Sequence, residues 1–178
     1  MIIGLLGRAR VGKDTVARLL QDHLQGEDYI ILRIAQPIKS AVCALYNINP
    51  SVLESAEKEA YIPGYNITPR QAMQAITDTY LKKHSDFFFS QQVFAKIDAS
   101  TNKHCVIPDI RYNHDVIEVQ KRGGVVIKVT RPENKVYHEC ESTVDKCSYN
   151  LEIVNDGNMN ELDTKVLFIS QMLRKLNH

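Results

Sequence analysis

The sequence predicts an α/β protein in three layers, in which a parallel sheet of five strands carries helices on both faces. Short apolar runs of strand length alternate with helix-like segments along the 178 residues, and this alternation is typical of parallel sheets. The first apolar run leads through a glycine-containing turn directly into an amphipathic helix, which is a second sign of the same architecture. The five predicted strands are residues 1–6, 29–35, 104–108, 125–130 and 151–154.

The composition is that of an ordinary globular protein of one domain. Hydrophobic residues make up 44% of the chain, charged residues 24%, and the formal net charge is +1. This near-neutral charge argues against a general nucleic-acid binder, which needs a basic surface. No apolar run approaches the length of a membrane span, and the N-terminus lacks the charged start of a signal peptide. We therefore expect neither a nucleic-acid nor a membrane partner.

The four cysteines are Cys43, Cys105, Cys140 and Cys147, and none forms a CxxC pair. Scattered cysteines beside a nucleotide site fit a reducing cytoplasm, which is the predicted location. His138, Cys140 and Cys147 are candidate zinc ligands. They lack a second ligand pair with metal spacing, so a zinc site is not the favoured interpretation.

The strongest motif is the turn after the first strand, a G-x-x-x-x-G-K pattern that runs from Gly7 to Lys13 and includes Arg10. Strand, glycine loop and helix are the context of a phosphate-binding P-loop, so the predicted architecture is the P-loop NTPase fold. Gly7 and Gly12 lack a Cβ atom, so the backbone can aim several N–H groups at phosphate oxygens. Lys13 would reach the terminal phosphates of ATP. The alternative is a strand–turn–helix unit with a chance pair of glycines.

Three oxygen-bearing side chains are the predicted ligands of Mg²⁺, which together with ATP is the predicted cofactor. Asp14 stands where Ser or Thr usually follows the lysine, and Thr15 comes next. Asp14 could ligate the metal, or it could cap the helix while Thr15 contacts phosphate or metal, and both remain open. Asp109 ends an apolar strand, where a carboxylate commonly holds Mg²⁺ directly or through water.

Cationic side chains are predicted near the same edge of the sheet. Ligands of such sheets bind beyond the carboxyl ends of the strands, and this rule collects Lys39, Asp109, Arg111 and Arg131 with the loop. Arginine matches phosphate through paired N–H donors. With Arg70, the chain has more arginines here than one ATP needs, which indicates a second, phosphorylated substrate.

Between the second and third strands the chain is predicted to leave the core. A helix ends near residue 46, and residues 47–66 are rich in turns. Thr68 then begins a strong helix as N-cap, with Pro69 at its first position and Gln71 completing a capping box; another helix is predicted over 86–99. The prediction is one P-loop domain with a core of 1–46 and 100–178, a substrate-binding helical insertion at about 47–99, and a lid-like loop at about 131–150.

Several segments, in order over nearly the whole chain, resemble the deoxynucleoside monophosphate kinases of the bacteriophage type. The GKDT form of the loop is typical of that group, and the TPRQ helix start with the His138 and Glu141 stretch is more specific. Where the family often has H-x-S-E, this chain has Cys140 in place of the serine. The segments are GLLGRARVGKDTVARLL, AQPIK, ITPRQAMQ, VIPDIRYNHDVIEV, YHECE and LEIVNDGNMNEL.

The resemblance implies phosphoryl transfer from ATP to a deoxynucleoside monophosphate, giving the diphosphate and ADP. It further implies that Arg70 and Arg111 hold the acceptor's phosphate, with Lys39 nearby, and that Gln74 faces its base or sugar. Arg131 would act in catalysis together with Lys13 and Asp109. Closure of the loop after Arg131 would exclude water. Small kinases of this group often pair, so a homodimer is one expected assembly.

Two other readings remain open. One is a P-loop kinase for another small phosphorylated metabolite, because dephospho-coenzyme A kinases and animal-type phosphomevalonate kinases look similar in the loop, the D-x-R segment and the closing segment. The other is a nucleotide-binding regulatory or scaffold protein that has lost phosphoryl transfer. The accepted bases do not follow from the sequence.

Overall fold

A computed structural model of the chain describes residues 1–24, 29–85, 87–101, 104–132 and 144–176. The chain divides into two compact units, which are described separately below. Unit 1 comprises Met1–Arg33 and Val93–His178, and unit 2 comprises Ile34–Gln92. The predicted insertion at 47–99 lies largely within unit 2, although its exact limits stay a prediction.

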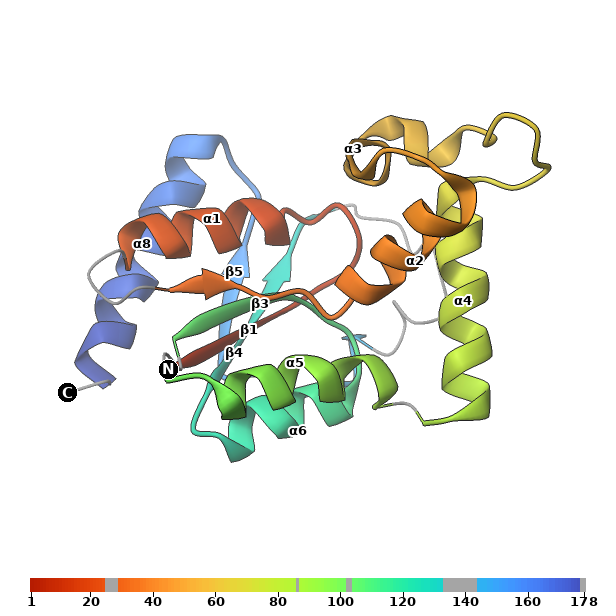
Figure 1. Cartoon of the computed structure of the whole chain (residues 1–178). Coiled ribbons are helices and arrows are strands. Elements are labelled where there is room, and N and C mark those ends of the chain that lie inside the picture. Colours follow the sequence, from red (N-terminus) through yellow and green to blue (C-terminus); the bar gives the residue numbers. More distant parts are fainter. Residues whose placement is uncertain (25–28, 86, 102–103, 133–143, 177–178) are drawn as a thin grey trace. The chain divides into compact units, whose positions relative to one another are not determined.

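Unit 1 contains a sheet of five parallel strands in the order β2-β3-β1-β4-β5, which confirms the predicted sheet (Figure 1). The central strand β1 is buried along its whole length because strands flank it on both sides and helices cover both faces. The strands are β1 (Ile2–Leu6), β2 (Ile30–Ile31), β3 (Cys105–Ile110), β4 (Val125–Thr130) and β5 (Leu151–Val154).

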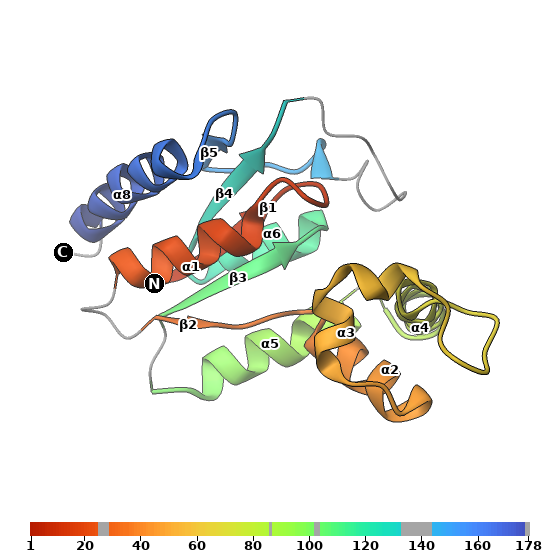
Figure 2. The same ribbon diagram turned by 90° about the horizontal axis from the view of Figure 1, so that it is seen from above.

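Helices cover both faces of this sheet, so the unit has three layers (Figures 1 and 2). On one face, α1 (Lys13–His23) and α8 (Met159–Leu176) pack against each other and the strands. On the other face lies α6 (Asn113–Lys121), and Arg122 at its end binds Asp98 of α5 (Phe88–Ala99).

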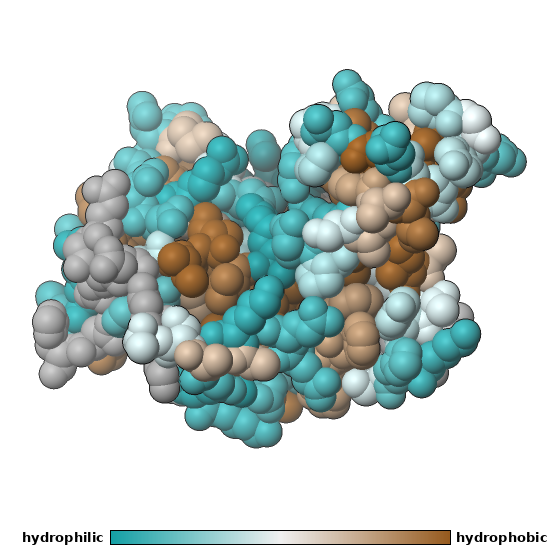
Figure 3. Space-filling view, in the orientation of Figure 1, coloured by the Kyte–Doolittle hydropathy of each residue, from teal (hydrophilic) through white to brown (hydrophobic). Residues whose placement is uncertain are grey.

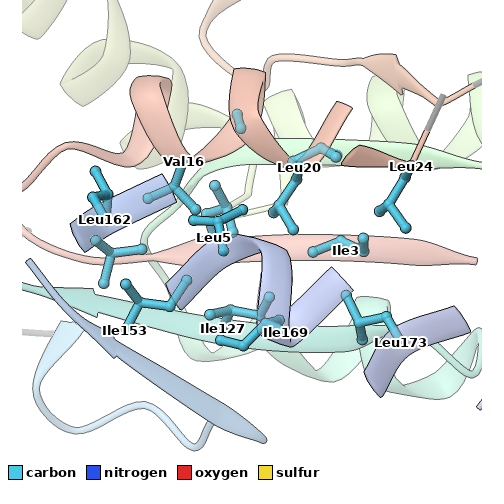
Figure 4. Packing of buried hydrophobic residues seen from close by; sticks show 14 of the residues in the cluster. Ile3, Leu5, Val16, Leu20, Leu24, Ile127, Ile153, Leu162, Ile169 and Leu173 are labelled. Atoms are coloured by element: carbon cyan, nitrogen blue, oxygen red, sulfur yellow. The ribbon is translucent and has the colours of Figure 1, made fainter. Parts of the chain in front are cut away.

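The core between the sheet and the first helix layer consists mainly of branched aliphatic side chains (Figure 4). Leu20 of α1 and Leu173 of α8 are almost completely buried there with Leu5 of β1. These helices therefore place one apolar stripe against the strands, as their sequence periodicity predicts. This packing fixes the start of α1, and with it the glycine loop.

The second strand is shorter than predicted, because only Ile30–Ile31 of the predicted 29–35 pairs as a strand. Leu32 still donates its N–H to the Val106 carbonyl. The next bond of a parallel ladder would need an N–H donor at Pro108, and proline has none. The register between β1 and β3 is also irregular at this point, where Gly4 pairs with Ile107 and Leu6 with Ile110.

Unit 2 is helical and has its own small core around Val42, Leu53 and Ala72. The predicted capping box is present, since the Thr68 hydroxyl accepts the Gln71 N–H and the Gln71 side chain accepts the Thr68 N–H. The helical elements are α2 (Gln36–Tyr46), α3 (Pro50–Glu54), the 3₁₀ turn η2 (Ala56–Glu59) and α4 (Pro69–Lys83).

The surface view shows hydrophilic atoms over much of the visible face, with hydrophobic atoms in separate patches (Figure 3). Among the residues that the structure describes, no helix combines the length and the apolar character that a membrane crossing requires.

Candidate active site

The turn between β1 and α1 has the backbone of a phosphate-binding loop. Gly12 has φ of 101°, a value that side chains disfavour, and Arg10 also has a positive φ of 63°. A Cβ atom at Gly7 would lie 2.4 Å from the Val129 carbonyl oxygen of β4. The two glycines of the motif are therefore required by the fold, one by its conformation and one by the close approach of a neighbouring strand.

Lys13 is the first residue of α1 and its side chain returns over the loop. Its Nζ atom donates to the carbonyl oxygens of Gly7, at 2.7 Å, and Arg8, at 2.6 Å. The amine is thus held directly at the loop, where the N-terminus of α1 also favours negative charge. A phosphate bound in this loop would meet the ammonium group and the backbone donors together.

The two predicted metal ligands of the loop belong to the first turn of α1. The helix N-cap is Gly12, so the alternative in which Asp14 caps this helix is wrong. Asp14 is exposed and its carboxylate pairs with the Arg33 guanidinium. Thr15 follows it and is half-buried. The structure thus adds Arg33 to the surroundings of this candidate site.

A hollow of about 90 Å³ lies beside the loop, within unit 1. Three cationic side chains line it, and Asp145 pairs with Arg8 while lying 3.8 Å from the Lys128 amine. Arg131, which is predicted to act in catalysis, is one of the lining residues. The lining residues are Gly7, Arg8, Val11, Lys128, Val129, Thr130, Arg131, Val144 and Asp145.

The carboxyl ends of three adjacent strands bring further predicted residues to this edge of the sheet. Leu6, the last residue of β1, pairs with Ile110 of β3 on one side and with Lys128 of β4 on the other. Asp109 and Arg111 therefore flank the loop on the β3 side. Asp109 lies within β3 and not after it, since the strand continues to Ile110.

The turn that carries Arg111 is held by hydrogen bonds to a carboxylate that the sequence did not predict as part of the site. Asp115 is 2% exposed and accepts the backbone N–H groups of Arg111 and Tyr112, at 3.4 and 3.3 Å. His114 also approaches Asp115, with 3.0 Å between Nε2 and Oδ1. Arg111 itself is exposed.

The two predicted acceptor-binding cations of unit 2 make ion pairs with carboxylates of the same unit. The Lys39 amine lies 2.6 Å from Glu54 Oε1, and Arg70 Nε donates to Glu59 Oε1 at 2.6 Å. Gln74 lies four residues after Arg70 on α4 and is half-buried, which puts both on one face of that helix.

The structure therefore groups the predicted residues in two sets. Unit 1 contains the loop residues and the strand-end residues, which all lie at one edge of its sheet. Unit 2 contains Lys39, Arg70 and Gln74. The set of unit 1 is Gly7, Arg10, Gly12, Lys13, Asp14, Thr15, Asp109, Arg111 and Arg131.

Several residues near the candidate site were not predicted from the sequence. Asn155 follows β5 directly and donates its side-chain amide to the Val11 carbonyl in the loop. The rule that ligand sites collect at the carboxyl ends of strands could have found it, because Asn155 is the first residue after β5. No local signal marks Glu59 or Asp145, since surface carboxylates are common.

Some predictions fall on residues that the structure leaves undescribed. His138, Cys140 and Glu141 lie outside the described residues, as does most of the predicted lid. Cys147 is described and is buried, and this burial raises the pKa of its thiol. Within the described parts of the chain, no group of three or more His, Cys, Asp or Glu side chains has the arrangement of a metal site.

Solved structures share this fold with low sequence identity. Shikimate kinase from Aquifex aeolicus matches with a TM-score of 0.52 and 12% identity over 100% of both chains. The protein TT1252 from Thermus thermophilus matches with a TM-score of 0.51 and 13% identity over 97% of both chains. At this low identity the similarities show the fold alone, which is that of the P-loop kinases. The phosphotransferase class is shown by the family model that matches the chain.

The family follows from sequence comparison. A model of the phosphomevalonate kinase family matches residues 5–124, and the chain belongs to that family. A protein of Acanthamoeba polyphaga mimivirus, provisionally described as a deoxynucleotide monophosphate kinase, is 24% identical over 185 residues, or 94% of each chain. This relative confirms the resemblance to deoxynucleoside monophosphate kinases seen in the sequence motifs.

Proposed function

We propose that the chain transfers the γ-phosphoryl group of ATP to a deoxynucleoside monophosphate, giving the diphosphate and ADP. The observation that carries the ATP half is the glycine loop, with Gly12 in a positive-φ conformation and the Lys13 amine held at the loop carbonyls. The acceptor half is supported by the mimivirus relative, whose similarity extends over nearly all of both chains.

In this proposal the loop binds the phosphates of ATP. Backbone N–H groups between Gly7 and Gly12 donate to phosphate oxygens, and the N-terminus of α1 adds its partial positive charge. Lys13 moves from the loop carbonyls to the terminal phosphates and stabilises the charge that develops during transfer. Arg10 and Arg131 add positive charge from the loop and from the end of β4.

The proposed metal is Mg²⁺, and the residues present suit it. Asp14, Thr15 and Asp109 offer carboxylate and hydroxyl oxygens, which are the ligands that a hard cation prefers. When bound, the metal would neutralise charge on the phosphates of ATP. Asp14 would leave its pair with Arg33 to reach it, and Asp109 would approach directly or through water.

The proposed acceptor site uses cationic side chains for the acceptor's phosphate. In unit 2, Arg70 would donate paired N–H groups to it, with Lys39 as a further cation. Gln74 would face the base or sugar. Little covalent chemistry falls to the protein, because alignment of the acceptor phosphate with the γ-phosphate and charge stabilisation supply most of the catalysis.

A second candidate acceptor is phosphomevalonate, because the matching family model carries that description. Both acceptors present a terminal phosphate, so the same cations would serve either one. They differ in the rest of the molecule, since only the nucleotide has a base for Gln74 to contact.

An acceptor panel tests the proposal. ADP formation from ATP and Mg²⁺ would be followed with each of the four common deoxynucleoside monophosphates, the matching ribonucleotides, phosphomevalonate and dephospho-coenzyme A. We expect turnover with at least one deoxynucleoside monophosphate, and little turnover with phosphomevalonate or dephospho-coenzyme A. Turnover on phosphomevalonate alone would establish the second candidate. ATP binding without turnover on any acceptor would contradict both and favour a non-catalytic nucleotide-binding protein.

A further inference from the structure

Asn155 joins the end of β5 to the glycine loop, although 144 residues separate it from Val11 in sequence. Its side-chain Nδ2 donates to the Val11 carbonyl oxygen at 2.9 Å, and its backbone N–H donates to the Thr130 carbonyl at 2.8 Å. The residue is 8% exposed. Both bonds are internal to unit 1, and together they hold the amide between β4 and the loop.

The loop accommodates this amide because residue 12 is a glycine. A Cβ atom at Gly12 would lie 2.6 Å from Asn155 Nδ2, closer than side chains approach one another. The same glycine has φ of 101°. The absence of a side chain at position 12 therefore permits both the unusual backbone conformation and the close approach of Asn155.

The bond to Val11 determines where the following N–H points. The carbonyl of Val11 and the N–H of Gly12 belong to the same planar, trans peptide, so they point in opposite directions. With its carbonyl oxygen held by Asn155 on one side, this peptide directs the Gly12 N–H to the other side. A phosphate cradle needs its N–H donors fixed in this way before the ligand arrives.

We propose that Asn155 is a positioning residue for nucleotide binding, which fixes the Val11–Gly12 peptide so that the Gly12 N–H is aimed at the phosphates of ATP. This inference rests on the proposed use of ATP and not on the identity of the acceptor. An amide is suited to the role because it donates a hydrogen bond without charge. An aspartate of the same shape has only acceptor atoms when ionised, and it would repel both the Val11 carbonyl and the phosphates.

The chain offers a matched control at the opposite end of β5. Asn150 precedes this strand, and its Oδ1 accepts the Val126 N–H at 2.8 Å, while its own N–H donates to the Val126 carbonyl at 2.8 Å. The residue type is the same and each side chain bonds to the main chain, although Asn155 donates its bond, Asn150 accepts its bond, and Asn150 is more exposed. Its bond holds the start of β4 and leaves the loop untouched.

The first test compares Asn155→Ala, Asn155→Asp and Asn150→Ala with the parent. Binding of ATP and ADP would be measured by calorimetry. The values of kcat and of KM for ATP and for the acceptor would be measured with an acceptor that the parent enzyme phosphorylates. We expect Asn155→Ala to raise the Kd of ATP about tenfold, the effect of one lost hydrogen bond. Asn155→Asp should weaken ATP binding more. In each variant the acceptor's KM should stay near the parent value, and Asn150→Ala should bind ATP like the parent.

A second readout reports on the peptide itself. Val11–Gly12 is the one Val–Gly pair in the sequence, so carbonyl-labelled valine and nitrogen-labelled glycine select a single amide signal in NMR. We expect ADP to shift this signal in the parent and in Asn150→Ala. In Asn155→Ala the signal should already be displaced without ligand, and the shift on adding ADP should shrink. This readout detects the effect even where activity is too low to measure.

Three results would overturn the inference. One is parent-like ATP affinity with an unchanged Gly12 signal in folded Asn155→Ala or Asn155→Asp. Another is an equal loss of ATP affinity in Asn150→Ala, which would show a general effect of stability. A parent that binds no ATP would overturn the proposed function, and with it this role for Asn155. If the parent binds ATP but phosphorylates no acceptor, the proposed acceptor is contradicted. The role of Asn155 is then decided by the ATP affinities of the variants.

Discussion

The two units keep their candidate phosphate-binding groups in different ways. In unit 1 the loop is held by buried and main-chain contacts: Lys13 binds two loop carbonyls, and Asn155 binds a third. In unit 2 the cations Lys39 and Arg70 are held by carboxylates that are themselves about half exposed, Glu54 and Glu59. One site depends on backbone geometry, and the other depends on side-chain charge.

This difference has a physical consequence for how each site responds to a phosphate. The loop of unit 1 is already shaped, so a bound phosphate would add contacts without displacing a charged side chain of the protein from the backbone donors. In unit 2 a phosphate would compete with a carboxylate for each cation. Exposed ion pairs contribute little, about 0.2–1 kcal/mol, so a phosphate dianion can displace them.

The largest expected effect is on the loop. Lys13→Ala should lower kcat by about 10²- to 10³-fold, because charge stabilisation during transfer is lost. The fold should persist, since Lys13 is only partly buried and its contacts lie on the loop surface. Turnover and circular dichroism would be measured together. Near-parent activity in a folded variant would refute the assignment of the ATP site.

The next effect concerns the acceptor cation on α4. Arg70→Ala should lower kcat/KM for every accepted deoxynucleoside monophosphate by about ten- to a hundredfold, the value of a charge-assisted contact. Gln74→Ala should instead change the ranking among bases. ATP affinity should stay constant in both variants. Uniform, parent-like kcat/KM values for Arg70→Ala would show that the acceptor's phosphate binds elsewhere.

A smaller effect, of opposite sign, would come from the carboxylate that faces Arg70. Glu59→Gln removes the competing charge, so the KM of the acceptor should fall by about two- to fivefold, as the worth of an exposed ion pair implies. Glu57→Gln is the matched control, because it makes the same change in charge within the same 3₁₀ turn. An equal fall in both variants would indicate a general electrostatic effect instead of competition at Arg70.

The smallest effect is expected at a site that contacts neither candidate substrate. Arg122 binds both carboxylate oxygens of Asp98, pairs with Glu118 and lies over the Phe94 ring, 4.7 Å from its centroid. Arg122→Met should lower the free energy of unfolding by about 1 kcal/mol, a fall of about 2–4 °C in Tm. The kinetic constants should not change.

The pH dependence of the contact between Arg122 and Glu118 gives a second test of its contribution to stability. Hydrogen bonds from Arg122 and Lys121 hold the pKa of Glu118 below its ordinary value of 4.5. A carboxyl with a lowered pKa stabilises the fold fully above its unfolded pKa, and this contribution is lost as the pH falls through the folded pKa. The stability difference between the parent and Arg122→Met should therefore shrink below about pH 4.5. A difference that stays constant to pH 3 would contradict this account.

Residues that are close together in the sequence determined much of the fold and of the candidate ATP site. The glycine loop, the amphipathic stripe of α1 and the capping box at Thr68 were all predictable, because each depends on residues a few positions apart whose geometry is local. The five-stranded sheet was predictable for a related reason. Alternating strands and helices leave few ways to bury their apolar faces.

The tertiary structure alone decided which partners these groups have. Pro108 shortens β2 because the two strands happen to meet where proline would have to donate. Asn155 reaches Val11, and Glu59 reaches Arg70, across separations that carry no sequence period. A polar side chain shows its chemistry in the sequence, but its partner depends on which chain segments the packing brings together, and that is a property of the whole fold.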